Sequence, residues 1–364
     1  MKIEIKKKGF EIAIGNVSKA LNANSPLHSL QGVYLKVTGN SLILIASNGN
    51  LSIKEEVSEV SWLNIIQPGE VLLPGKLFTE VIKKHSDEIT ISETKDFVEV
   101  TSNDMSTKIN ILNPTDYPTI SFEATGKDVI IDSSKLRSII KNVSFAASDQ
   151  DKRIILNGVN LSAKGGKLTA AATNSYRLAR EESEINNEAE FEVTILSKNL
   201  RDFIPASAKG EIKISVNDSK IITKYETTTV VSNLIDGVYP QIERLIPTEA
   251  KATLKIDAKE IAKLIDKATV VSNEANKVVK MTIDTNLIVE SKRDEVGNTK
   301  VESHNFKWEG GQFSIAFNAQ FFKEAVSKFS GEIEIKFLGP LKPFVIVGDS
   351  NKNLLQLVLP HRSY

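Results

Sequence analysis

Short amphipathic helices that run directly into alternating strands recur three times along the chain. In each recurrence the apolar residues follow the i, i+3, i+4 spacing of a helix that buries one face, and the polarity period then changes from 3.6 to 2 residues. Phe78, Leu200 and Phe322 occupy the same place in the three segments and lie 122 residues apart without a gap. The segments are GKLFTEVIKK with DEITIS, SKNLRDFIPASAKG with EIKISV, and NAQFFKEAVSKFSG with EIEIKF.

A second helix opens each repeat, and hairpin patterns such as GVYLKVTGNSLILIAS and GVNLSAKGGKLTAAAT separate the two helices. Further alternating strands close each repeat. We therefore predict an α+β fold of three repeated domains, each with two helices packed on an antiparallel sheet. The predicted helices are residues 10–23, 75–85, 134–148, 197–208, 257–270 and 320–329. Where the apolar periodicity lapses we place the domain boundaries, giving domains at 1–125, 126–249 and 250–364.

Charge is unevenly distributed between these elements. The chain has 46 Lys and Arg against 46 Asp and Glu, so its formal net charge is zero. The six predicted helices nevertheless contain fourteen Lys or Arg and only seven Asp or Glu. For a single lysine, a solvated helix face is the simpler interpretation. The sixfold recurrence favours a shared surface that attracts the phosphates of duplex DNA without reading its sequence.

Signatures of catalysis and metal binding are missing from the sequence. The four histidines have no metal-ligand spacing, and Gly165, Gly166 and Lys167 fit a hairpin turn instead of a phosphate loop. The chain contains no cysteine, which excludes disulfides and thiolate sites. We find no paired nucleophile and base, and we predict no catalytic residue, no metal and no cofactor.

No stretch has the length or apolar character of a secretory signal or a membrane span. We therefore expect a cytoplasmic protein with no membrane partner. A three-domain structural or adhesive scaffold without a DNA role is the alternative function, and an enzyme comes third.

Several motifs, in this order and at these places in the repeats, resemble those of the bacterial sliding clamp family, the beta subunit of DNA polymerase III. They are TNSYRLAR at 173–180, VYPQIERLIP at 238–247, SNE at 272–274 and LPHRSY at 359–364, and the resemblance covers the whole chain. It implies the DNA clamp fold, in which one chain forms half of a closed ring and two chains join head to tail. The implied function is non-catalytic: the homodimer encircles duplex DNA regardless of sequence and tethers the replicative polymerase for processive synthesis.

The resemblance also implies a groove that receives short linear peptides from the polymerase, the clamp loader and repair proteins. Its lining in this chain would be Leu156, Thr173, Ser175, Tyr176, Arg177, Leu178, Pro240, Arg244, Leu245, Pro343, Val358, Leu359, Pro360, His361 and Arg362. The family usually reads Thr-Asp-Gly-or-Ser-His-Arg-Leu at the first motif. This chain has Asn174 and Tyr176, so it loses one charge and gains a bulkier ring.

For DNA binding, helix charge and the resemblance together select eleven residues. They are Lys19, Lys76, Lys83, Lys135, Arg137, Lys141, Gln150, Arg153, Lys198, Arg201 and Lys263. At positions matching the family's DNA-contacting loops this chain has Asn24, Ile154 and Ile155 in place of the arginine and tyrosine pair common elsewhere. The implied dimer seam pairs the edge strand around Ile109 with Val270 and Val271.

Overall fold

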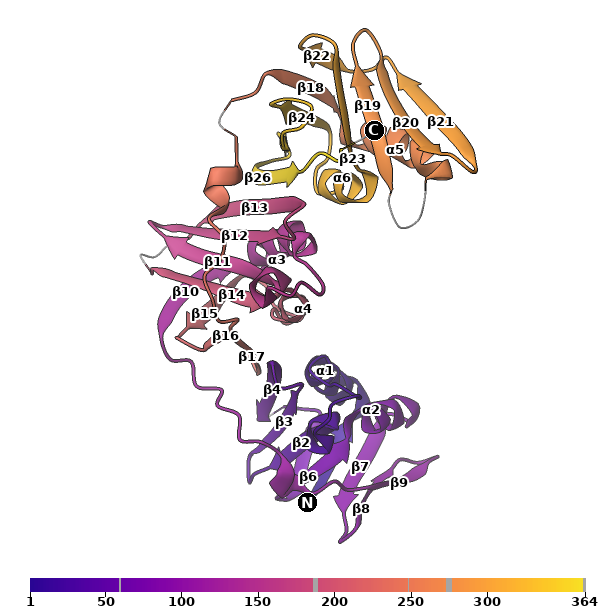
Figure 1. The fold of residues 1–364 in the computed structure, drawn as a ribbon. Helices are drawn as coiled ribbons and strands as arrows, with labels where there is room; N and C mark the ends of the chain where they lie inside the picture. The colour runs from indigo at the N-terminus through magenta and orange to yellow at the C-terminus, as the bar shows by residue number, and fades with distance from the viewer. Residues whose placement is uncertain (59, 186–188, 248, 273–276, 363–364) are drawn as a thin grey trace. The chain divides into compact units, whose positions relative to one another are not determined.

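The computed structural model describes residues 1–364 except 59, 186–188, 248, 273–276 and 363–364. The described residues form two compact units, each built of helices and antiparallel strands (Figure 1). The first unit contains residues 1–137, 185–191 and 198–234, and the second contains residues 138–184, 192–197 and 235–364.

The first unit has a five-stranded sheet of order β5-β1-β7-β8-β9 and an eight-stranded sheet of order β10-β15-β16-β17-β4-β3-β2-β6. Its strands are β1 (Lys2–Lys6), β2 (Gly32–Val37), β3 (Ser41–Ser47), β4 (Leu51–Ser58), β5 (Leu63–Gln67), β6 (Gly69–Pro74), β7 (Glu88–Glu93), β8 (Phe97–Thr101), β9 (Ser106–Asn110), β10 (Lys127–Asp132), β15 (Glu211–Val216), β16 (Lys220–Tyr225) and β17 (Thr228–Asn233). The helices α1 (Lys7–Ser18) and α2 (Gly75–Lys84) contact each other and pack their apolar faces inward.

The second unit has a nine-stranded sheet of order β14-β11-β12-β13-β26-β25-β24-β18-β22 and a four-stranded sheet of order β21-β20-β19-β23. Its strands are β11 (Gly158–Lys164), β12 (Lys167–Thr173), β13 (Arg177–Glu184), β14 (Phe191–Leu196), β18 (Ala252–Asp257), β19 (Val278–Ile283), β20 (Leu287–Arg293), β21 (Gly297–Ser303), β22 (Lys307–Glu309), β23 (Phe313–Asn318), β24 (Glu332–Phe337), β25 (Phe344–Gly348) and β26 (Asn351–Val358). Its helices include α5 (Ala258–Ala268) and α6 (Ala319–Val326). The division between the two units falls inside α3 (Ser133–Val143), after Arg137, and inside α4 (Ser197–Leu200), after Ser197.

The predicted helices are present with shifted bounds, and α1, α3 and α4 end five or more residues before the predicted ends. Helix α1 begins directly after β1 and ends at Ser18, so Lys19 follows the helix instead of lying inside it. Helix α4 ends at Leu200, and the prediction of a helix over 197–208 is wrong beyond that residue. Pro205 explains the difference, because it lacks an N–H and disfavours the helical conformation of the residue before it. Phe203 and Ile204 remain buried although the backbone there is irregular.

The predicted hairpins and the two-residue polarity period are confirmed. Strands β2 and β3 pair in one hairpin, and β11 and β12 pair in another whose turn places Gly165 and Gly166 at φ of 56° and 74°. This left-handed backbone is readily adopted only by glycine, as expected for a tight hairpin turn. In β7 the alternation buries Ile89 and Ile91, so the strand presents one apolar face to the core.

The last strand of one repeat pairs with a strand of the preceding repeat, and a buried glutamate marks each such junction. Strand β17 pairs with β4, where Glu55 is 2% exposed and lies opposite Thr228. The Glu55 carboxylate accepts hydrogen bonds from Asn16 Nδ2 (2.8 Å), Thr227 Oγ1 (2.8 Å) and the Thr228 hydroxyl. Burying a carboxylate is unfavourable without such donors, so this network fixes the junction in one arrangement.

The junction of β13 with β26 repeats the same arrangement. Glu181 of β13 is 5% exposed and accepts hydrogen bonds from Asn142 Nδ2 (3.0 Å) and Asn351 Nδ2 (2.8 Å). Glu181 follows Glu55 by 126 residues, and Asn142 follows Asn16 by the same interval. Two junctions in the chain therefore share one polar arrangement, in which the side-chain amide of a helix asparagine donates a hydrogen bond to a buried strand carboxylate.

The third repeat has no glutamate at the corresponding strand position. Glu55 lies opposite Leu44 and Glu181 opposite Ala170 in their hairpins, and the matching pair in β20 and β21 is Val289 and Val301. Among the described strands, β21 pairs only with β20, and β9 of the first repeat pairs only with β8. The inter-repeat junction pairs a hairpin strand of one repeat with the last strand of the next. Among the described strands, β21 is a hairpin strand without such a partner, and β9 is a last strand without one.

Removing the helix donor tests how much the buried carboxylate depends on it. We expect Asn16→Ala to lower the free energy of unfolding by about 1–2 kcal/mol. A lost hydrogen bond to a charged group costs roughly 1.5–3 kcal/mol, and the better helix propensity of alanine returns about 0.5 kcal/mol. Urea unfolding followed by circular dichroism measures the change. Asn353→Ala, at an exposed position of β26, is the matched control and should change stability by less than about 0.5 kcal/mol.

Candidate functional site

Three distant stretches of the second unit meet in one apolar cluster beside the β13–β26 pairing. In that pairing Arg177 lies opposite Val358 and Leu178 opposite Leu357. The buried members of the cluster are Ala171, Leu178, Tyr239, Ile242, Val345 and Leu357, and the partly buried members are Ile155, Ile246, Val347, Leu355 and Leu359. Segments near residues 171–178, 239–246 and 345–359 therefore share one patch of core.

The predicted groove residues all belong to the second unit, as the cluster does, but only two of them are among its members. Leu178 is buried and Leu359 is partly buried within it. Leu156 and Val358 are also buried, as ordinary core residues are. Tyr239, Ile242 and the remaining cluster members have no distinguishing signal in the sequence, because alternating apolar positions in a strand or short helix have the same pattern whether or not they line a binding site.

Several predicted groove residues adjoin cluster members in the sequence and are more exposed than they are, and we call them the edge residues. Arg244 and Leu245 are exposed in a short 3-10 helix, and Pro240 before it is exposed as well. Pro343, Leu359 and Pro360 are partly buried. The exposed His361 and Arg362 follow them, whereas Ser363 and Tyr364 of the same motif lie outside the described residues.

Backbone hydrogen bonds hold the C-terminal segment in place. The Leu359 N–H donates to the Tyr176 carbonyl oxygen (2.9 Å), and the His361 N–H donates to the Ala316 carbonyl oxygen (2.7 Å). Pro360 forms a bridge with Phe317 of β23. The segment therefore joins the turn before β13 to the third repeat's own sheet.

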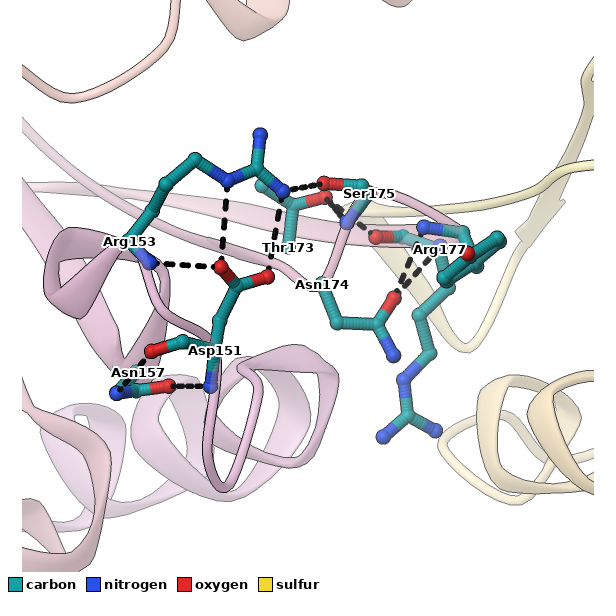
Figure 2. A network of polar contacts seen from close by, with 8 residues as sticks. Asp151, Arg153, Asn157, Thr173, Asn174, Ser175 and Arg177 are labelled. Carbon is teal, nitrogen blue, oxygen red and sulfur yellow. Dashed lines mark hydrogen bonds and ion pairs between the residues drawn. The ribbon is translucent and has the colours of Figure 1, made fainter.

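The turn that contains the TNSYR motif is fixed by its own side chains (Figure 2). Asn174 Oδ1 accepts hydrogen bonds from the N–H groups of Tyr176 and Arg177, both at 3.0 Å. Thr173 Oγ1 accepts from the Ser175 N–H (3.1 Å) and donates to the Arg177 carbonyl oxygen (2.6 Å). Ser175 has a φ of 73°, in the left-handed region that favours glycine, so these bonds stabilise an unfavourable backbone conformation.

A loop at residues 151–157 reaches the same turn through Arg153 (Figure 2). Asp151 accepts hydrogen bonds from the Arg153 N–H (2.8 Å) and Nε (3.2 Å), and Arg153 Nη2 donates to Ser175 Oγ (2.8 Å). Asn157 closes the loop by accepting from the Asp151 N–H (2.8 Å). The Arg153 side chain, followed by its backbone N–H, lowers the pKa of Asp151, so this carboxylate stays charged beside the guanidinium.

Arg177 points away from the turn, and its largely covered side chain, 11% exposed, lies between aromatic rings. Its guanidinium bonds to Glu324 and to the Phe145 carbonyl oxygen. It also lies over the rings of Phe145 (5.0 Å) and Phe321 (4.7 Å). Arg177 thus links the turn to α6 and to the segment after α3. In the neighbouring apolar cluster, burial raises the pKa of the Tyr239 phenol.

Most of the predicted DNA-binding residues are exposed. These are Lys19, Lys76, Lys83, Lys135, Lys141, Gln150, Arg153, Lys198, Arg201 and Lys263. Arg137 is only partly exposed, because it donates to the carbonyl oxygens of Ala208 (3.0 Å) and Pro205. With their observed bounds, the six α-helices carry thirteen Lys or Arg and five Asp or Glu. The excess of positive charge on the helices is therefore larger than the predicted bounds gave.

The residues predicted for the dimer seam lie at two separate edges. Ile109 is buried on β9, the last strand of its sheet. Val270 is 78% exposed and Val271 is partly exposed, in a 3-10 helix directly after α5. Of the SNE motif, Asn273 and Glu274 lie outside the described residues.

In the described part of the chain, no group of three or more His, Cys, Asp or Glu is arranged to hold a metal ion. Among the same residues, no helix has the length and apolar character needed to cross a bilayer.

Models of the three domains of the DNA polymerase III beta subunit match the chain. The N-terminal domain model matches residues 1–121, the central one 130–241 and the C-terminal one 243–362. The chain is 29% identical to a beta sliding clamp of Staphylococcus epidermidis and 28% identical to one of Staphylococcus aureus, over the full length of both proteins in each case.

Solved structures give the same result. The structure resembles the DNA polymerase sliding clamp of Bacillus subtilis and the DNA polymerase III beta chain of Streptococcus pneumoniae. In both cases the TM-score is 0.95, the identity is 25% and the coverage of each chain is complete. The predicted α+β clamp fold is confirmed, and a structural or adhesive scaffold is set aside. The chain belongs to the family of the DNA polymerase III beta subunit, the bacterial sliding clamps.

Proposed function

We propose that two copies of this chain close head to tail into a ring around duplex DNA, with domains at 1–125, 126–249 and 250–364 of each copy. The family assignment makes the chain a sliding clamp of DNA replication, a non-catalytic processivity factor whose partners are DNA and a polymerase. The observation that carries the ring is the pair of free strand edges. Among the described strands, β21 and β9 each lie at the end of a sheet with one edge unpaired. A second copy supplies the missing partners, because its β9 pairs with β21 of the first copy and its β21 pairs with β9.

The internal junctions predict the register of this seam. Ile109 of β9 lies opposite Val98 of β8, and Ser232 of β17 lies opposite Ile221 of β16 at the equivalent position of the second repeat. Ile109 therefore corresponds to Ser232. Ser232 pairs with Leu51 of β4, whose counterpart in β21 is Gly297. By this correspondence, Lys108 of one copy lies opposite Asn298 of the second copy in an antiparallel ladder.

In the ring, the basic helices attract phosphates without reading bases. The eleven residues named above remain our proposed DNA contacts. Arg137 would take part only after giving up its bonds to two carbonyl oxygens. The apolar cluster beside β13 and β26, with its edge residues, is the proposed docking groove for linear peptides of the polymerase, the loader and repair proteins. We also propose that the protein acts in the cytoplasm, where a bacterial replication clamp meets its DNA.

Topological binding is tested by changing the shape of the DNA alone. We expect the clamp, once loaded, to stay on nicked circular DNA during gel filtration and to be lost when a restriction enzyme linearises the circle, because a closed ring slides off an end. Capping both ends of the linear DNA with a bound protein is the control and should restore retention. Equal retention on uncapped linear and circular DNA would contradict the ring.

Cysteine crosslinking tests the seam and its register, because the chain has no cysteine of its own. We expect Lys108→Cys/Asn298→Cys to form covalent dimers on mild oxidation, since directly opposed Cβ atoms lie about 4.5–5.5 Å apart. Lys108→Cys/Glu302→Cys, four residues out of register, should remain uncrosslinked. The reverse result would show that the register is wrong.

The predicted seam side chains are tested by charge. Val271→Asp should convert the dimer to a monomer, because it places a carboxylate in an apolar contact, and light scattering after gel filtration measures the mass. Val238→Asp, at an exposed valine that adjoins none of the proposed seam residues, is the comparison and should leave the dimer intact.

The groove is tested by shortening the chain. Deleting residues 361–364 should abolish binding of the replicative polymerase of the same organism, measured by surface plasmon resonance, and should leave the dimer mass unchanged. Within the deleted part, the His361 N–H donates to the Ala316 carbonyl oxygen of β23, a strand that takes no part in the proposed seam. Unchanged polymerase affinity would reject this assignment.

A further inference from the structure

A buried histidine contacts the last hairpin of the first repeat at two points. His85 follows α2 directly and is 1% exposed. Its Nδ1 lies 2.9 Å from Ser102 Oγ in the turn between β8 and β9, and its Nε2 lies 3.3 Å from Thr107 Oγ1 of β9. One imidazole ring therefore joins α2 both to the turn of the β8–β9 hairpin and to its last strand.

The hydrogen bonds of the hairpin assign one tautomer to this ring. Ser102 Oγ donates its single hydrogen to Asp104 Oδ1 (2.9 Å), so it accepts from the histidine. Nδ1 therefore carries the hydrogen of the neutral ring, and Nε2 accepts from the Thr107 hydroxyl. A second ring proton would require the Thr107 hydroxyl to turn away, so the neutral ring fits this chain of bonds best.

The backbone that carries His85 is itself fixed at the end of α2. Lys7 Nζ donates to the carbonyl oxygens of Lys83 and His85, both at 2.8 Å, and the Lys7 N–H donates to the Asp87 carbonyl oxygen (2.8 Å). A cation here satisfies carbonyl groups that have no partner inside the helix. The ring thus connects the hairpin to a firm point where α1 and α2 meet.

Only the first repeat has this histidine, and its last strand is also the one with an unpaired edge. The same sequence position holds Ser207 in the second repeat and Phe329 in the third. Strands β17 and β26 each have two neighbours in the chain, whereas β9, among the described strands, has only β8. A short strand paired on one edge frays without further contacts, and ordering it during association would cost conformational entropy.

The charge of the ring affects how well it can fix the hairpin. Burial lowers the pKa of His85 below its usual range, Asp104 of the hairpin opposes this change, and Lys7 of α1 adds to it. The other cations in the last turn of α2, Lys83 and Lys84, are exposed. The closed hairpin therefore favours the neutral ring. Its contribution is complete above about pH 6.5, the usual pKa of histidine, and is lost as the pH falls through the lowered pKa.

We propose that His85 is a positioning residue of the dimer seam. Its neutral ring fixes the β8–β9 hairpin on the end of α2, so the unpaired edge of β9 is formed before a second copy pairs with it, and protonation of the ring releases the hairpin. Because it is buried, His85 acts on the second copy through β9. The proposal rests on the ring of two copies proposed above and names the side chain that prepares one of its two seam strands.

Sedimentation velocity over a dilution series tests the positioning near neutral pH. We expect His85→Phe, which keeps a buried ring but removes both hydrogen bonds, to raise the dissociation constant of the dimer about tenfold. His85→Asn, whose amide can still donate to Ser102 Oγ, should recover part of the affinity. His28→Phe, at an exposed histidine, is the matched control and should dissociate as the wild-type protein does.

The same series separates this proposal from the ring itself. A wild-type protein that stays monomeric at every concentration would contradict the ring. A wild-type dimer whose dissociation constant is unchanged by His85→Phe would overturn the role of His85 and leave the ring standing.

Hydrogen exchange of monomers separates positioning from folding. On monomers obtained by dilution or by Val271→Asp, we expect His85→Phe to speed the exchange of amides in residues 102–110 about tenfold, with unchanged exchange in β1 of the same sheet. A variant that unfolds as a whole would lose protection in β1 as well. Equal exchange of the hairpin with and without His85→Phe would show that β9 is ordered by other contacts and would overturn the proposal.

The pH dependence of dissociation is the result that a merely structural residue would not change. Between about pH 7.5 and 5.5, we expect the dissociation constant of the wild-type dimer to rise about threefold to tenfold more than that of His85→Asn, which has no titrating ring at this position. The two proteins share all other titratable groups, so the difference isolates His85. His28→Phe should follow the wild-type profile. Parallel profiles for the wild-type protein and His85→Asn would overturn release by protonation.

Discussion

Antiparallel pairing between strands of different repeats is the interaction on which the rest of this structure depends. It occurs where β17 meets β4 and where β26 meets β13, and at both places a carboxylate is buried under a helix asparagine. A buried carboxylate is tolerated only when its hydrogen bonds are made, so each junction has one acceptable register. The register in turn brings the TNSYR turn beside the C-terminal segment and assembles the apolar cluster between them.

This arrangement explains why the candidate site draws on such distant parts of the chain. The turn before β13 is fixed by Asn174 and Thr173, and Arg177 extends from it into the core of the third repeat. The 151–157 loop is fixed by Asp151 and Asn157 and reaches the turn through Arg153. Local hydrogen bonds shape each piece, and strand pairing brings the pieces together.

Much of the fold could be predicted from the sequence, because periodicity records burial directly. Helices such as α2 and α5 and the hairpin of β11 and β12 follow from spacing and from Gly165 and Gly166. The end of α4 was missed because the apolar spacing continues to Phe203 and Ile204, which stay buried in an irregular backbone. The strand at Lys2–Lys6 shows as alternation, but its neighbours in the sheet are set by contacts that no local pattern contains.

The candidate site was less accessible to this reasoning. Its motifs could be located by resemblance, yet Tyr239, Ile242 and Val345 are ordinary apolar positions until the strands pair. The packing of Arg177 between Phe145 and Phe321 also has no signal in the sequence, since the two rings are separated by more than one repeat.

Val301 gives the third repeat a different character. Where two junctions enclose a carboxylate, the corresponding position of β21 is an aliphatic side chain packed at the edge of the core. In the proposed ring, parting the two copies would wet hydrocarbon at this position without having to hydrate or protonate a buried ion. The two junctions inside one polypeptide are thus held by the hydrogen bonds of a buried carboxylate. The proposed junction between polypeptides has no such ion to hydrate, so it is suited to opening and closing many times.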